Sequence, residues 1–133
     1  MMDTTKAASL PILTNSDAWP LTALGLGEPM RFRMKGDRGS AQSNALSPDG
    51  RPTLASGCIP QLLDKEGRLR PQKGHSLHVI NAVPDDVIEA GEQVRADGLV
   101  WVQPYESNGR VLLSITVESL VPVTAPAPKK TEA

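Results

Sequence analysis

The chain has few cysteines that could form disulfide bonds and lacks long apolar runs that could span a membrane. Cys58 is the only cysteine among 133 residues, so an intrachain disulfide is excluded. No apolar run approaches membrane-spanning length, and no apolar stretch follows Lys6 near the N-terminus. These absences predict a soluble, cytoplasmic protein with neither a secretory signal nor a membrane partner.

The sequence also lacks an excess of charge of either sign, because 14 Lys and Arg face 15 Asp and Glu. The two signs are nevertheless separated along the chain. Residues 30–74 carry nine cations and four acids, whereas residues 84–120 carry seven acids and two arginines. This separation predicts a basic and an acidic face, with an ordinary mixed surface as the alternative.

Residues able to bind a metal or attack a substrate are scarce. His75, His78 and Cys58 are the only imidazole and thiol groups in the chain. Two histidines three positions apart on a strand point to opposite faces, and four ligands at the spacing of a structural zinc site are missing. No nucleophile motif surrounds Cys58. The sequence therefore predicts no metal site, no cofactor and no enzymatic activity.

Both ends of the chain lack the pattern of a packed element. Residues 1–29 show no period of 2 or 3.6, so we expect an N-terminal arm that is partly ordered at most. Residues 124–133 combine Pro, Lys and Ala without a large apolar residue, which predicts a disordered tail. The folded unit is therefore expected to span residues 30–123.

Five strand-like segments lie between these ends. In the first, Met30, Phe32 and Met34 alternate with cations, which predicts one apolar and one charged face. The pair Asn108-Gly109 before the last segment is typical of a tight hairpin. The segments are residues 30–35, 52–63, 75–83, 93–103 and 110–121.

The alternation along these segments also predicts which side chains form the core. The predicted buried residues are Phe32, Val100, Ile115 and Val117. In the last segment Val111 and Leu113 share the inward phase, while Ser114, Thr116 and Glu118 point outward.

Five short strands with this turn spacing indicate an all-β domain that hides its sheet edges by closing on itself. The commonest five-stranded solution is the OB-like barrel, and we expect that fold, with an SH3-like barrel as the alternative. The helix that usually joins the third and fourth strands would shrink to one turn within residues 85–90.

Short motifs mark the ends of the predicted strands. They are Asp49-Gly50-Arg51-Pro52, the segment 91–100 with its spaced glycines, Pro104-Tyr105 and Val121-Pro122-Val123. This layout, over residues 30–123, resembles small OB-like regulatory or replication-associated proteins of actinobacterial plasmids and integrative elements. The family carries Trp at the position of Tyr105. The resemblance implies a role in a mobile genetic element.

Two basic clusters are candidates for contact with a phosphate backbone. Arg31, Arg33 and Lys35 share one face of the first segment because they are spaced by two. A second cluster lies in the hairpin around the turn at residues 64–67 and comprises Lys65, Arg68, Arg70 and Lys73. The alternative is that both are ordinary solvated surface.

Aromatic residues are few, at four in the whole chain, and a single-strand binder uses them to stack on bases. Trp101 falls on the opposite face from Val100, beside Leu99. An exposed Trp101 would stack on a base, and we favour the alternative that the N-terminal arm covers it. Tyr105 is the other candidate.

These observations predict a non-enzymatic, OB-like protein that binds single-stranded DNA or RNA and supports replication or transfer of a mobile genetic element. The alternative is a protein-interaction adaptor that uses the arm, the acidic half and a Leu99/Trp101 patch to hold a replication or transfer protein. The candidate nucleic-acid-binding residues are Arg31, Arg33, Lys35, Arg68, Arg70, Lys73, Trp101 and Tyr105.

Overall fold

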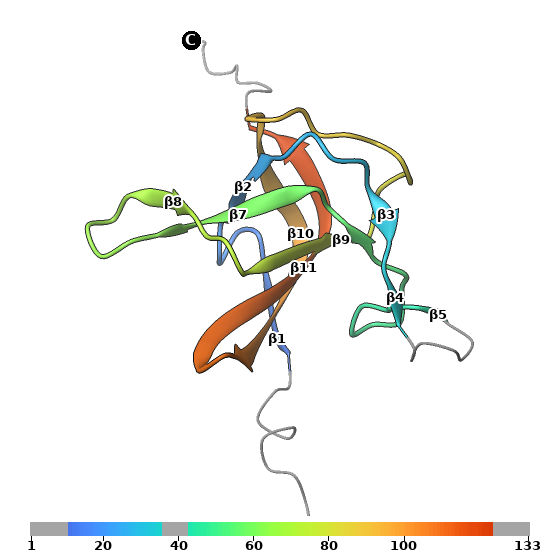
Figure 1. Ribbon diagram of the computed structural model, residues 1–133, viewed down its shortest axis with the longest axis horizontal. Coiled ribbons are helices and arrows are strands. Elements are labelled where there is room, and N and C mark those ends of the chain that lie inside the picture. Colours follow the sequence, from blue (N-terminus) through green and yellow to red (C-terminus); the bar gives the residue numbers. More distant parts are fainter. Residues whose placement is uncertain (1–10, 36–42, 124–133) are drawn as a thin grey trace, which may run out of the picture.

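The computed structural model describes residues 11–35 and 43–123, and this part of the chain is built from β-strands without a helix (Figure 1). The predicted all-β class is confirmed. The longest strands, β10 (Gln93–Ser107) and β11 (Arg110–Pro122), form a hairpin around which the other strands are arranged. The described residues include no helix that is long and apolar enough to span a bilayer.

Nine strands belong to one sheet. Eight of them follow the order β3-β6-β9-β11-β10-β2-β7-β8, and β1 adds to β10. The pair β11 and β9 is parallel, and the other pairs are antiparallel. The remaining strands are β1 (Ile12–Asn15), β2 (Thr22–Gly25), β3 (Arg31–Phe32), β6 (Leu54–Ala55), β7 (Cys58–Leu63), β8 (Leu69–Pro71) and β9 (Ser76–Val79).

A separate two-stranded sheet projects from this main sheet. It consists of β4 (Met34–Lys35) and β5 (Ser43–Asn44) and is called the β4–β5 hairpin below. Backbone bonds fasten its base, because Ala45 N–H donates to Arg33 C=O at 2.7 Å and Thr53 N–H donates to Ala45 C=O at 3.1 Å. The region between the first two predicted segments therefore contains a strand, β5, in its described part.

The predicted N-terminal arm contributes two strands to the sheet. β1 pairs with residues 99–102 of β10, and β2 lies between β10 and β7. Leu21 and Ala23, at 2% and 0% exposure, belong to the core. The arm was expected to be partly ordered at most. Within it, residues 12–15 and 22–25 form strands, because strand pairing does not require a long alternating pattern. The predicted tail, residues 124–133, lies outside the described residues.

The first predicted strand is divided between two sheets. Residues 31–32 pair with β6, whereas residues 34–35 turn away into the β4–β5 hairpin. Met30 is buried, but Phe32 is 44% exposed and Met34 is 51% exposed. The prediction that Phe32 is buried is therefore wrong, because β3 is a two-residue strand at one end of the sheet and reaches beyond the core.

Residues 54–63 form one bent segment that serves two neighbours. Its first part, β6, pairs with β9, and the Ser56 N–H extends that pairing by donating to Leu77 C=O at 3.2 Å. Its second part, β7, pairs with β2. The bend occurs at Gly57, whose φ of +68° favours glycine and where a Cβ would lie 2.7 Å from the Glu28 carbonyl oxygen.

The strand pairing does not close on itself, because β3 and β8 stand at opposite ends of the order. The predicted five-stranded closed barrel is therefore not confirmed. The predicted helical turn at residues 85–90 is wrong: Asp85 has a φ of +72°, and its N–H donates to Met30 C=O at 2.8 Å. The carbonyl groups of Asp86 and Ile88 accept from Met30 N–H and Gly27 N–H of another segment, so no helical ladder continues here.

Alternate residues of the strands meet in one apolar core. Val100, Ile115 and Val117 are each 0% exposed, which confirms three of the four predicted core residues. Val111, predicted to share their inward phase, is 69% exposed, because this end of the β10–β11 hairpin extends past the core. Beyond these, the core includes Leu21, Ala23, Leu54, Cys58, Leu77, Val79, Val94 and Ala96.

A polar network locks the bulge in β10. Register between β10 and β11 shifts at residues 97–100, where Gly98 has a φ of +99°. The Leu99 N–H freed by this bulge donates to Glu118 Oε1 at 2.8 Å, and Arg51 Nη2 donates to Glu118 Oε2 at 3.0 Å. Arg51 also bonds to Asp49, so the turn at residues 47–51 is tied to the central hairpin.

Candidate nucleic-acid interface

The three predicted cations of residues 31–35 occupy different environments. Arg31 is exposed and lies 3.5 Å from the Asp85 carboxylate. Arg33 is half-buried, its guanidinium donates to Thr53 Oγ1 at 3.2 Å, and burial lowers its pKa. Lys35 is exposed on β4 and forms no ion pair with a described residue. Of the three, Lys35 therefore has the charge most readily available to a ligand.

The second basic cluster is largely occupied by its own acids. Asp64 accepts a hydrogen bond from Arg70 Nε at 3.1 Å, and Arg68 Nε lies 3.6 Å from the same carboxylate. The pKa of Asp64 is lowered, first by the Arg68 backbone N–H and then by the Arg70 side chain. Arg68 also reaches Glu66 at 3.4 Å, and Lys73 is exposed without an ion pair to a described residue.

The structure does not bring the two basic clusters together. In Figure 1 the β7–β8 hairpin projects from one side of the sheet and the β4–β5 hairpin from the other. Arg68 and Arg70 belong to the first projection and Lys35 to the second. One nucleic-acid strand following both clusters would have to cross the body of the molecule.

Trp101 does not present an open face for stacking. Its side chain is 6% exposed, so the exposed alternative is wrong, and a Leu99/Trp101 surface patch is not formed either. Leu13 of β1 stands directly opposite Trp101 in the register, which places the described part of the N-terminal segment beside the indole. The remaining exposed part of Trp101 lines a groove described below.

Tyr105 is partly exposed, at 36%, on the far part of the β10–β11 hairpin. Its hydroxyl donates to Gly74 C=O at 3.0 Å and so ties the hairpin to the segment after β8. The side chain therefore remains partly accessible while its hydroxyl has a structural partner.

A polar groove of about 570 Å³ lies between the β4–β5 hairpin and the outer face of β10 and β11. Arg33 and Lys35 supply positive charge on one wall, and Trp101 contributes an aromatic surface to the other. We call this the polar groove. Its further lining residues are Pro11, Met34, Ser43, Asn44, Ala45, Leu46, Ser47, Pro48, Gln103, Ser114 and Thr116.

The floor of the polar groove belongs to a continuous row across the sheet. Directly paired residues project to the same face, so the register defines this row. His78 stands in it beside Thr116; the side chain is 7% exposed and its Nδ1 has no hydrogen-bond partner among the described residues. Burial, and then the Arg33 charge, lower the pKa of His78 to about 4. The row runs Leu13, Trp101, Thr116, His78, Ala55 and Arg31.

With a pKa of about 4, His78 is neutral at pH 7, so the positive charge of the polar groove comes from Arg33 and Lys35. Hydroxyl and amide groups of Ser114, Thr116 and Asn44 offer donors and acceptors along the groove. Such a surface suits a flexible anionic chain with polar and aromatic edges better than an apolar ligand.

Most lining residues of the groove were not among the predicted site residues, and Asn44, Ser114 and Thr116 are examples with polar side chains. Ser114 and Thr116 were predicted to point outward, so their direction could be found from the alternation of β11. The sequence could not show that the β4–β5 hairpin lies over this outward face, because a two-residue strand such as β5 has no alternating pattern. Thr116 is consequently 8% exposed although it lies on the polar phase.

The histidines and the cysteine serve the fold. His75 Nδ1 accepts the Leu113 N–H at 2.7 Å, and burial, followed by the Arg110 charge, lowers its pKa. Cys58 is buried in the core, and burial raises its pKa to about 11. The described residues contain no group of three His, Cys, Asp or Glu side chains arranged to hold a metal ion.

Comparisons with protein-family models, with curated proteins and with solved structures find no match to this chain.

Proposed function

We propose that this protein is a sequence-tolerant, OB-like domain that binds single-stranded nucleic acid in the polar groove. The observation that carries the proposal is the groove itself: Arg33 and Lys35 face hydroxyl groups and the edge of Trp101 across it. Non-specific single-strand binders combine positive charge that follows the backbone with aromatic and polar groups that meet the bases. No enzymatic step is part of this proposal.

The arrangement of five strands supports an OB-like barrel. If β2, the bent segment 54–63, β9, β10 and β11 are numbered in chain order, their neighbours run 1-2-3-5-4. Segment 54–63 bonds to both β9 and β2, so the path from the third strand to the first is bridged at the Gly57 bend. A partly open Greek-key barrel of five strands is the OB architecture. The first strand of this barrel is β2, in place of residues 30–35.

The position of the polar groove supports the same conclusion. In this numbering the β4–β5 hairpin lies in the connection between the first and second strands. OB domains bind oligonucleotides with that connection and with the one between the fourth and fifth strands. The groove wall that carries Lys35 is therefore placed where this architecture presents ligands. In the cell, we propose that the domain serves replication or transfer of a mobile genetic element, in keeping with the resemblance of residues 30–123.

A titration of fluorescently labelled oligo-dT with the full chain, followed by anisotropy at low and moderate salt, tests this function. We expect binding that weakens as salt rises, because phosphate contacts release counterions. Lys35→Glu should weaken binding about tenfold, equivalent to ~1.4 kcal/mol. Lys65→Glu is the matched control, since Lys65 is exposed at the turn between β7 and β8, away from the groove.

Two outcomes would contradict the proposal. Equal weakening by both lysine variants would mean that binding follows overall charge and does not use the polar groove. No binding by the wild-type chain at low salt would remove the nucleic-acid function, and the protein-adaptor alternative would take its place.

A further inference from the structure

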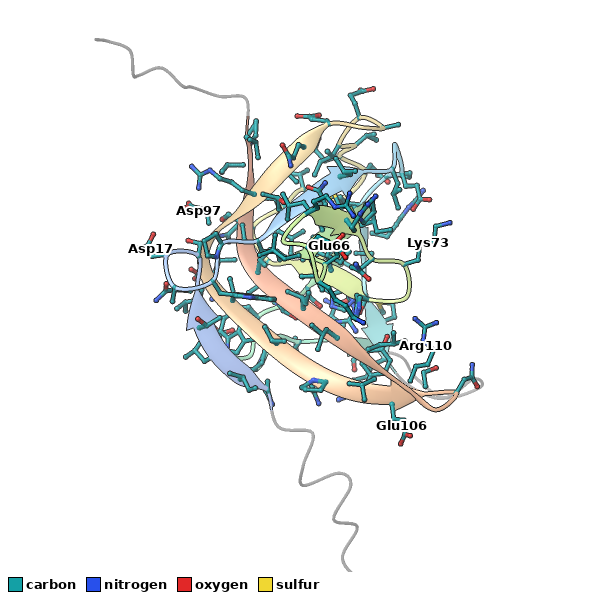
Figure 2. All side chains as sticks on the ribbon, turned by 90° about the vertical axis from the view of Figure 1, so that its left-hand side faces the viewer. Asp17, Glu66, Lys73, Asp97, Glu106 and Arg110 are labelled. Atoms are coloured by element: carbon teal, nitrogen blue, oxygen red, sulfur yellow. The ribbon has the colours of Figure 1, made fainter. Side chains whose placement is uncertain are left out.

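A second groove, of different chemistry, lies at the β2-β7-β8 end of the sheet. It measures about 580 Å³ and is formed by the end of the Asn15–Trp19 turn together with β2, β7 and β8. Asp17 marks that turn in Figure 2, and Glu66 marks the tip of the β7–β8 hairpin. We call it the apolar groove; it is lined by Trp19, Pro20, Thr22, Gln61, Leu62, Leu63 and Leu69.

Large apolar side chains along the apolar groove are exposed to solvent. Leu63 is 68% exposed and Leu69 is 46% exposed, and they stand opposite each other in the register of β7 and β8. Trp19 and Leu62 are half-buried beside them and pack against the core. Contiguous exposed apolar surface of this kind marks an interaction site more often than scattered single residues do.

The strand that borders the apolar groove has an unpaired edge in the described residues. β8 ends the strand order, with β7 as its only neighbour there. Asp64 N–H bonds to Arg68 C=O and Gln72 N–H bonds to Pro60 C=O, so hydrogen-bonded pairs alternate along this ladder. Leu69, paired with Leu63, falls between two such pairs. Its N–H and C=O therefore point away from β7, toward any added strand.

The hairpin that carries this edge is positively charged. Between residues 64 and 73, four cations accompany two acids. Arg68 and Arg70 are 62% and 52% exposed although they contact Asp64, and each guanidinium has donors left over. An occupant with carboxylates beside its apolar residues would complement this rim.

We propose that the apolar groove binds an extended, acidic peptide segment of a partner protein. One or two large apolar side chains of that segment fill the space between Trp19 and Leu63. Its backbone pairs with Leu69 at the edge of β8, and its carboxylates meet Arg68 and Arg70. Adding a strand to a sheet edge, with side-chain pockets giving selectivity, is a recurring way to bind peptides.

The size of the groove favours a peptide over a second folded copy. A stable interface between folded proteins buries about 800 Å² on each partner. A groove built from seven residues beside a three-residue edge strand fits a short segment instead. Pro71 lacks an N–H and restricts the pairing to the neighbourhood of Leu69. The apolar lining, with three leucines and Trp19, disfavours nucleic acid at this position.

A display selection tests the proposal with a defined probe. The full chain is immobilised and presented with a random library of ten-residue peptides, in parallel with a Leu63→Asp/Leu69→Asp variant. Both positions are exposed, and a near-UV circular dichroism spectrum checks that the variant is folded. Val83→Asp is the matched control, because Val83 is 64% exposed on a different segment.

We expect the wild type and Val83→Asp to enrich peptides with one or two large apolar residues flanked by Asp or Glu, and the double variant to enrich none. A synthetic peptide of the enriched sequence should bind at least tenfold more weakly to Arg68→Glu/Arg70→Glu. Its binding should also slow amide exchange at Leu69.

Several results would overturn the proposal. Equal enrichment by the wild type and the double variant would place any peptide binding elsewhere, and enrichment of basic peptides would contradict the charge argument. Absence of enrichment would exclude peptide binding. Concentration-dependent dimerisation of the wild type that is lost in Leu63→Asp/Leu69→Asp would assign the groove to a second copy. The oligo-dT titration is separate, so failure of one proposal is distinguishable from failure of the other.

Discussion

At the scale of single residues, the distance from the centre of the sheet decides burial as much as the phase along a strand does. Ile115 and Val111 share one phase of β11, four positions apart, yet Ile115 is 0% exposed and Val111 is 69% exposed. The hairpin of β10 and β11 is longer than the core that it crosses. Side chains near its tip, such as Val111, therefore extend beyond the core into solvent. The alternation of apolar and polar residues predicts to which face of the sheet a side chain points. How deeply that side chain is buried depends on which strands lie opposite it.

This contrast can be measured in urea. Ile115→Ala removes buried methyl groups and leaves a cavity, so we expect the free energy of unfolding to fall by about 2–5 kcal/mol. Val111→Ala, in the same strand and phase, should change it by less than about 0.5 kcal/mol because the side chain is largely in water. Similar losses in the two variants would contradict the described end of the core.

Glu118 is the residue that makes the β10 bulge pH-sensitive. Its pKa is lowered first by the Leu99 N–H and then by the Arg51 side chain. A carboxyl whose pKa is lower in the folded than in the unfolded state stabilises the fold above its unfolded pKa. That contribution is present above the ordinary value of about 4.5 and disappears as the pH falls further.

We therefore expect Glu118→Gln to lower the Tm at pH 7 by roughly 3 °C, corresponding to a hydrogen-bonded surface ion pair of about 1 kcal/mol. The difference from wild type should shrink progressively as the pH falls below 4.5. Glu106→Gln, at the exposed tip of the same hairpin, is the control and should leave the Tm unchanged at both pH values. A difference in Tm that is constant with pH would mean that the carboxylate charge of Glu118 is not involved.

At the scale of elements, the bend at Gly57 lets one segment, residues 54–63, pair with two different strands. β6 before it pairs with β9, and β7 after it pairs with β2. Both the positive φ and the nearby Glu28 carbonyl exclude a side chain at this position. The change of partner from β9 to β2 therefore occurs next to a position that accommodates only glycine.

Two glycine substitutions separate backbone strain from crowding. Gly57→Ala and Gly67→Ala both place Ala at positive φ, which costs about 1 kcal/mol each. A Cβ at Gly67 would meet nothing within 4 Å, whereas at Gly57 it would collide with the Glu28 carbonyl. We expect Gly57→Ala to destabilise the protein by at least 1 kcal/mol more than Gly67→Ala in urea denaturation. Equal effects would show that the bend relaxes without cost.

The elements found from the sequence are those with a long stretch of alternating apolar and polar residues or with a strong turn signal. Residues 93–103 and 110–121 were located as strands, and Asn108-Gly109 forms the turn between them. The missed elements, such as β1, β5 and β8, are two to four residues long and owe their strand geometry to a partner. A segment this short carries no periodic signal, so its pairing is a property of the whole fold.

Prediction of the candidate site from the sequence was limited for the same reason. The cations of residues 31–35 share a spacing of two, but the chain changes sheets after Phe32 and takes Lys35 away from Arg31. Arg68 and Arg70 are close to Asp64 because a hairpin turn brings them there. Spacing along the chain therefore identified charged residues and could not group them into one surface.

At the scale of the whole molecule, the structure has two grooves of different character on different parts of one sheet. The polar groove has cations, hydroxyls and the edge of Trp101, while the apolar groove has leucines and Trp19. These two residues are the only tryptophans in the chain, so each groove contains one natural reporter. A domain of this design could hold a nucleic-acid strand and a partner peptide at the same time.

The most direct test of the nucleic-acid function records the two indole N–H signals of ¹⁵N-labelled protein while unlabelled oligo-dT is added at low salt. Trp19→Phe assigns the two signals by removing one of them. We predict that the Trp101 signal shifts with added oligo-dT and that the Trp19 signal stays in place, because only Trp101 lines the polar groove. A shift of Trp19 alone, or no shift of either signal at saturating oligo-dT, would contradict binding in the polar groove.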